Sequence, residues 1–149
     1  MPRTINNLIQ SSSKIQILDI IVQAMENTEK QAISAQQQQL ISGLRSDDEN
    51  IFNIQTGSDE YSPAYAKKKG KLKPIDLYDT GAFSGGVFAQ PSRDGILLDS
   101  SDQKSQLLQK NYGTEIFGFG TGAKTDYLDA VGPEFVRLIS ESLNEKVSV

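Results

Sequence analysis

Apolar residues recur three and four positions apart in two stretches, one near each end of the chain. The first stretch covers residues 11–45 and the second covers residues 126–146. This spacing predicts amphipathic helices. Three serines at positions 11–13 are expected to cap the first helix. The pattern leaves open whether the first stretch is one long helix or two helices that meet near Asn27 and Thr28.

The middle of the chain changes to short apolar runs between turn residues. Residues 83–90 and 95–99 flank a Pro-Ser-Arg-Asp sequence that is typical of a turn, so we expect a β-hairpin. A short helix should follow over residues 100–110. We therefore predict one α+β domain over residues 1–149, with a polar loop at 46–74, a β-rich core with a short helix at 75–122 and helices at both ends.

Composition then limits the chemistry. The 149 residues carry a formal net charge of −4 and contain no Cys and no His, which excludes disulfides, thiol nucleophiles, His-based catalysis and His-ligated metals. No stretch is long and apolar enough to span a membrane, and the start of the chain lacks the apolar segment of a secretory signal. We expect a cytoplasmic protein with no cofactor, no metal and no membrane contact.

One short motif has a possible catalytic meaning. Asp79-Thr80-Gly81, preceded by Leu77 and Tyr78, resembles the catalytic turn of retroviral-type aspartic proteases, in which two subunits each contribute one aspartate. The surrounding sequence departs from that pattern, because helices are predicted on both sides and a lysine-rich segment precedes the motif. We therefore interpret these three residues as a structural turn, in which Gly supplies a backbone angle that other residues avoid.

A basic segment stands just before this turn. Residues 67–73, the lysine segment, contain the only concentration of charge in the chain, and it is expected to be a solvated loop or a contact with DNA or an acidic partner. With the segment 63–69 as a short helix, the lysines should point outward and Tyr61 and Tyr65 should lie on one side. The candidate contact residues are Lys67, Lys68, Lys69, Lys71 and Lys73.

A glycine-rich stretch further along carries two phenylalanines, Phe117 and Phe119. Its Gly-Phe-Gly-Thr-Gly sequence lacks the Lys-Ser/Thr ending of a phosphate-binding loop. We expect the glycines to let the two rings pack, and exposed rings would indicate a subunit interface.

The order of these features resembles a family. A Gln-rich helical run, Gly43, a Tyr-Ser-Pro sequence at 61–63, the lysine segment and the stretch at 75–83 are similar to small structural proteins of tailed phages of Bacteroidetes hosts. More distantly, residues 30–140 resemble the tail-completion or head-tail joining proteins of long-tailed phages. In the distant family a basic and then an apolar residue usually follow Thr-Gly, and the chain departs from that form because Ala82 and Phe83 stand there.

This resemblance implies a non-enzymatic function. In such proteins the Thr-Gly turn opens a central sheet, helices pack against it, and copies assemble as a ring at the neck. It implies self-association, contacts with portal, adaptor or tail proteins, a passing contact with DNA, and a location in the virion after assembly in the host cytoplasm. The alternatives are an aspartic protease that uses Asp79 and a small DNA-binding protein that uses the lysine segment.

Overall fold

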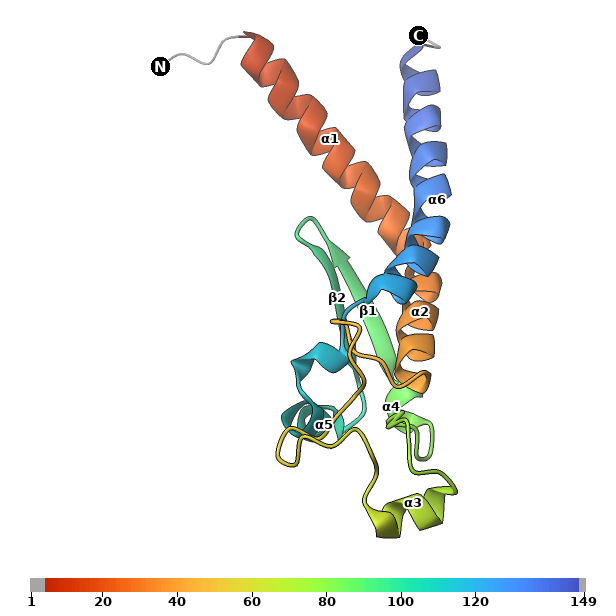
Figure 1. Ribbon diagram of the computed structural model, residues 1–149. Coiled ribbons are helices and arrows are strands. Elements are labelled where there is room, and N and C mark those ends of the chain that lie inside the picture. The colour runs from red at the N-terminus through yellow and green to blue at the C-terminus, as the bar shows by residue number, and fades with distance from the viewer. Residues whose placement is uncertain (1–4, 148–149) are drawn as a thin grey trace.

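The computed structural model describes residues 5–147, and for residues 5–12, 14, 15, 146 and 147 it describes the backbone alone. Two long helices, α1 (Ile5–Asn27) and α6 (Thr121–Val147), lean apart above a smaller body (Figure 1). The body contains α2 (Glu29–Ile41), a β-hairpin and short helices. Helices at both ends of a two-stranded antiparallel sheet confirm the predicted α+β class.

The N-terminal helical region is two helices, separated at Thr28. The backbone of Thr28 leaves the helical range (φ −114°, ψ 23°), and its hydroxyl donates a hydrogen bond to Ala24 O at 2.7 Å. A hydroxyl that bonds back to the preceding turn bends a helix. α1 begins before the three serines at 11–13, so the prediction that they cap the helix is wrong. Ile5, Leu8 and Ile9 extend the apolar pattern upstream of them.

The hairpin pairs β1 (Val87–Ser92) with β2 (Gly95–Ser100), with Val87 opposite Ser100. The first strand starts later than predicted, because residues 82–85 form the short helix α4 (Ala82–Gly85). The predicted four-residue turn is also shorter. Pro91 and Ser92 belong to β1, and only Arg93 and Asp94 connect the strands.

Small side chains let α2 lie directly on the hairpin. Ala32 and Ala35 of α2 are buried against Ala89 of β1 and Leu98 of β2. Tyr127 of α6 joins the same apolar cluster. A second cluster fills the lower body, and its buried members are Leu40, Ile51, Tyr61, Ile75, Phe83, Val87 and Ile116. Ile51 of the segment 51–54 therefore lies in the core, Ile54 is exposed, and the segment forms no strand.

The remaining elements are short. They are α3 (Pro63–Lys69), α5 (Ser105–Tyr112) and the 3₁₀ turn η1 (Thr114–Ile116). α3 has the predicted extent: Ser62 Oγ accepts a hydrogen bond from Tyr65 N at 3.4 Å, and Gly70 ends the helix with φ 78°. A positive φ suits glycine, which has no Cβ to clash.

Two glutamines of α2 fix the glycine-rich stretch that leads into α6. Gln36 is fully buried, donates to Ile116 O at 2.9 Å and accepts from Gly118 N at 2.9 Å. Gln39 donates to Gly118 O at 2.8 Å and accepts from Gly120 N at 2.7 Å. Each side-chain amide thus satisfies one carbonyl and one N–H of an irregular segment, which would otherwise be costly to bury.

The start of α6 is held by Asp48. Its carboxylate accepts from Thr121 N at 2.7 Å and from Thr121 Oγ1 at 2.5 Å, which places a negative charge at the positive end of the helix. These bonds lower the pKa of Asp48. Gly120 is required here, because a Cβ would lie 2.5 Å from Asp48 Oδ1 and 3.0 Å from Arg45 O.

The glutamine contacts give the first testable prediction. Gln36→Ala leaves Ile116 O and Gly118 N buried without partners, and we expect it to lower the free energy of unfolding by about 3 kcal/mol. The control is Gln38→Ala, since Gln38 is exposed on the same helix and should change stability by less than about 0.5 kcal/mol. Urea unfolding followed by circular dichroism measures both. Equal losses in the two variants would contradict this account.

Candidate functional site

A buried carboxylate organises the lysine segment. Asp76 accepts hydrogen bonds from Lys69 Nζ and Lys71 Nζ, both at 2.5 Å, and from Tyr61 Oη at 2.8 Å. Tyr61 Oη also accepts from Asp76 N at 3.0 Å, and Asp76 Oδ1 accepts from Tyr78 N at 3.0 Å. Two ammonium groups and a phenol therefore surround one carboxylate.

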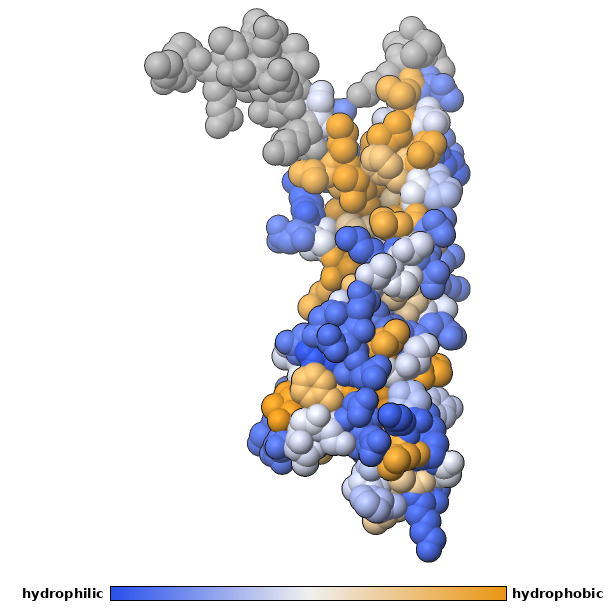
Figure 2. All heavy atoms as spheres, in the orientation of Figure 1, coloured by the Kyte–Doolittle hydropathy of each residue, from blue (hydrophilic) through white to orange (hydrophobic). Residues whose placement is uncertain are grey.

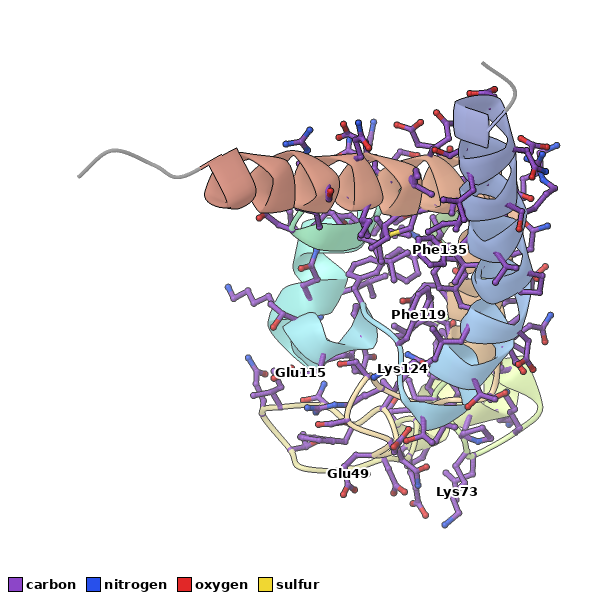
Figure 3. The ribbon with its side chains drawn as sticks, turned by 90° about the horizontal axis from the view of Figure 1, so that it is seen from above. Glu49, Lys73, Glu115, Phe119, Lys124 and Phe135 are labelled. Carbon is purple, nitrogen blue, oxygen red and sulfur yellow. The ribbon has the colours of Figure 1, made fainter. Side chains whose placement is uncertain are left out.

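This network changes the interpretation of the lysine segment. Lys69 and Lys71 turn inward to Asp76, so the prediction that all the lysines point outward is wrong. A buried carboxylate needs compensating partners, and these two are the nearest cations. Lys73 extends away from the body, with its Nζ 3.9 Å from Glu60 Oε1 (Figure 3). Lys67 and Lys68 remain exposed, and neither is in an ion pair with a described residue.

The network also shifts two pKa values. Burial by itself would raise the pKa of Asp76, but the hydrogen bonds from Lys69, Lys71, Tyr78 N and Tyr61 outweigh it and hold this pKa well below its usual range. Burial raises the pKa of the Tyr61 phenol. At neutral pH the site therefore holds an ionised carboxylate and a protonated phenol.

The Asp79-Thr80-Gly81 turn follows directly. Gly81 has φ 85°, and Thr80 Oγ1 accepts from Ala82 N at 3.3 Å, which starts α4. The turn therefore opens a short helix that leads into β1, and it does not open the sheet itself. Asp79 is exposed, and its carboxylate has no hydrogen-bond or ion-pair partner among residues 5–147.

A cavity of about 670 Å³ lies beside this turn. Its walls come from residues 53–62, the start of α3, the segment 72–83 and α5. Aromatic and aliphatic side chains form much of its lining, among them Tyr61, Tyr65, Leu72, Leu77, Leu108 and Tyr112. Its charged lining residues are Glu60, Asp79, Asp102 and Lys104. The volume is in the usual range for ligand-binding sites.

The two phenylalanines of the glycine-rich stretch are half-buried within the chain. The Phe117 ring packs on Phe83 with centroids 5.7 Å apart, and the Phe119 ring packs on Tyr127 with centroids 5.2 Å apart. Figure 3 shows Phe119 on the side of α6 that faces the rest of the molecule. Both rings thus serve the internal packing, and an exposed apolar surface lies elsewhere.

That surface belongs to α1 and α6, which we call the helical arms. Figure 2 shows apolar side chains gathered on the upper part of the molecule, between and along the arms. Leu128, Val136 and Leu143 of α6 are 53%, 61% and 58% exposed. At 100° per residue these three fall within about 80° of the helix circumference, so they form one face. The helical periodicity of residues 126–146 indicated Leu128 and Leu143 but not Val136, and it did not show that this face is exposed.

Comparisons with protein-family models, with curated proteins and with solved structures found no match. The part of the chain that the structure describes holds no cluster of three or more acidic side chains that could bind a metal. None of the helices between residues 5 and 147 is long and apolar enough to cross a membrane. Functional inference therefore rests on the helical arms, the lysine segment and the cavity.

The Asp76 network predicts a pH dependence of stability. Because the folded pKa of Asp76 is lowered, the folded chain binds fewer protons than the unfolded chain near pH 4, and stability falls as the pH falls. The stability that the Asp76 network contributes is fully present above pH 3.9, roughly the pKa of an Asp in the unfolded chain. It is lost progressively as the pH falls below that value. Asp76→Asn should flatten this dependence between pH 5 and pH 3.

Urea unfolding at pH 7, 5, 4 and 3 measures this effect. The matched control is Asp94→Asn, which replaces an exposed residue of the hairpin turn. This variant should keep the wild-type pH dependence of stability. If Asp76→Asn and wild type lost the same stability between pH 5 and pH 3, the network would not stabilise the fold.

Proposed function

We propose that this protein is a non-enzymatic virion component that assembles with itself as a ring at the neck or tail-completion position of a tailed phage. The observation that carries the proposal is the pair of helical arms, which leave the body with large apolar side chains exposed. Isolated helices gain little stability from propensity alone, and helices in proteins depend on tertiary packing. A neighbouring copy would supply that packing.

α1 supports this argument independently of α6. Ile17, Leu18, Ile20, Ile21 and Val22 spread over about 200° of its circumference, and none of the five is fully buried. A single neighbouring helix requires an apolar stripe of only about 100°. α1 therefore has more apolar surface than α6 and the hairpin cover within one chain.

The size of the arms fits a stable interface. With 23 and 27 residues, α1 and α6 are about 34 and 40 Å long. One face about 10 Å wide along the full length of both helices is at most roughly 700 Å², of the order of the 800 Å² that each partner of a standard protein interface buries. The first turns of α6 do not contribute to it, because Ala123 and Tyr127 are packed within the chain. The lower body is more polar on the face that Figure 2 shows, so self-association would use the arms and leave the body available for other virion proteins.

The lysine segment fits a minor role in this assembly. Lys67 and Lys68 are its remaining exposed cations without an ion pair among the described residues, and two lysines per copy repeat around a ring. A ring of such charges would contact passing DNA without sequence recognition. Dedicated DNA binding by a single copy is not favoured, because Lys69 and Lys71 are both bound to Asp76, whose carboxylate cancels one of their two charges.

The direct test is the oligomeric state. We expect wild-type protein to form a defined oligomer by sedimentation velocity and closed rings by negative-stain electron microscopy. Val136→Gln with Leu143→Gln should weaken association about a hundredfold or more, since two apolar side chains per copy lose their burial. A wild-type chain that stays monomeric at 100 µM would overturn the proposal.

A control variant on the charged side of α6 tests whether loss of assembly is specific to the apolar face and is not caused by any double substitution in this helix. Glu141→Gln with Glu145→Gln introduces the same residue type on another side of the same helix, where both glutamates are exposed. This variant should form the wild-type oligomer. Loss of assembly in both double variants would mean that the apolar face is not the specific contact.

The turn motif gives a separate prediction. Because the Asp79 carboxylate has no partner in the described chain, Asp79→Asn should retain the fold and the wild-type oligomer. Peptide cleavage by wild-type protein at acidic pH that disappears in Asp79→Asn would instead support the aspartic protease. Circular dichroism and sedimentation of the variant, together with a peptide-cleavage assay, make this comparison.

A further inference from the structure

The break between α1 and α2 is a single turn, and its sequence contains no residue that requires it. Residues 25–31 include no glycine and no proline, the residues that most often end a helix. Thr28 N donates to Ala24 O and Ala32 N donates to Thr28 O, both at 3.1 Å, so α-helical bonds continue on each side of Thr28. A continuous helix through α1 and α2 is therefore compatible with the sequence.

The bend leaves some helical interactions unmade. Met25 O accepts from Thr28 N at 3.3 Å, and Gln31 N donates to Thr28 O at 3.1 Å, so bonds over three residues replace the usual bonds over four. α2 also begins without a side-chain cap, because the Thr28 hydroxyl donates backwards to Ala24 O. The first N–H groups of a helix need such a partner or a preceding turn of helix. A straight chain at Thr28 would supply the preceding turn.

A pair of opposite charges lies across the same bend. Glu26 and Lys30 are four residues apart with the acid first, which is the favourable order for an ion pair on one helix. In the bent chain both side chains are exposed, and neither is in an ion pair with a described residue. A continuous helix would bring the two charges together. The residues at the bend thus suit a straight helix as well as a bent one.

The contacts that hold α1 on the body can form equally well between two copies. Asp19 forms an ion pair with Arg93 at the tip of the hairpin, and Asn27 Nδ2 donates to Glu134 Oε1 of α6 at 2.7 Å. Apolar contact adds to these bonds, since Ala24 of α1 is 0% exposed. The surface that receives α1 is therefore already complementary to α1. The α1 of a neighbouring copy fits it without any new contact.

We propose that α1 is exchanged between neighbouring copies in the oligomer. The chain straightens at Thr28, and α1 docks on the hairpin and α6 of the next copy in place of that copy's own α1. This inference rests on the proposed self-association and supplies its geometry. Each copy gives one α1 and receives one, and such head-to-tail contacts close into a ring.

The two arrangements of α1 differ chiefly at the hinge. The bent chain and the exchanged chain share the contacts of α1 with the hairpin and α6, so the balance between them depends on Thr28 and on protein concentration. A connection of one residue between two helices is short, and short hinges favour exchange. α1 is about 34 Å long and leans away from α6, which gives it the reach for a neighbouring body (Figure 1).

Two substitutions at Thr28 test the hinge as a matched pair. Thr28→Ala and Thr28→Gly both remove the hydroxyl bond to Ala24 O, but alanine favours a continuous helix and glycine does not. Sedimentation velocity should show about fivefold tighter association for the alanine variant than for the glycine variant. Equal association of the two variants would mean that straightening at Thr28 has no part in the assembly.

Cross-linking tests the exchange itself. The chain contains no Cys, so cysteines can be placed at both ends of one α1 contact as Asp19→Cys with Arg93→Cys, two exposed positions. A short bifunctional maleimide should link residue 19 of one copy to residue 93 of the next. A denaturing gel should then show a ladder that ends at the ring size. The control pairs Asp19→Cys with Lys68→Cys, an exposed position on α3 at the other end of the molecule, and should give no ladder.

The outcomes separate the exchange from the ring. Links that form only within single chains, in a sample that is oligomeric, would overturn the exchange and leave self-association in place. Links between chains that stop at two copies would retain the exchange and overturn the ring. A sample that is monomeric at 100 µM, with every link inside one chain, would overturn both.

Discussion

The hydrogen bonds between α2 and the stretch 116–120 determine how the whole molecule is arranged. Gln36 and Gln39 each bind a carbonyl and an N–H of that stretch, in the buried space between the helix and the turn η1. These four bonds fix the point where the chain enters α6. Since α6 begins at that point, capped by Asp48, its direction relative to α2 follows from them.

The direction of α6 then decides what remains exposed. The first turns of α6 pack Ala123 and Tyr127 against α2 and the hairpin, and Asn27 at the end of α1 donates to Glu134 Oε1 at 2.7 Å. Beyond these contacts the two arms lean apart, and large apolar side chains such as Ile17, Val136 and Leu143 stay exposed (Figures 1 and 2). Hydrogen bonds thus hold the body together, while the far ends of α1 and α6 expose apolar side chains. This exposed apolar surface is the basis for the proposed self-association.

The sequence predicted the elements better than it predicted their contacts. Apolar spacing gave the two helical ends, the hairpin and α3, because these depend on local periodicity and on Ser62, Pro63 and Gly70. It missed α4, because four residues carry no periodicity. The sequence did not indicate that two members of the Gln-rich run, Gln36 and Gln39, are buried, because their partners lie about 80 residues away.

The candidate site was predicted in part. The Asp79 turn and the tyrosine pair were found from turn residues and helical spacing, but the inward turn of Lys69 and Lys71 was not. Lys69 and Lys71 point inward because they bind Asp76, which Tyr61 and the lower core bury. Asp76, Tyr61 and the lower core all lie outside the lysine segment, so the segment alone could not indicate this orientation. The cavity is likewise formed by four segments that are distant in sequence, so no single motif could indicate it.

Hydrogen exchange of the helical arms at two protein concentrations tests the central claim most directly. If neighbouring copies cover the arms, amide protection in the second half of α6 and in α1 should rise steeply between 1 µM and 100 µM. Protection of α2 and the hairpin, which is set within one chain, should stay constant. Arms that exchange at the same rate at both concentrations, in a sample that remains monomeric, would contradict the claim that self-association buries them.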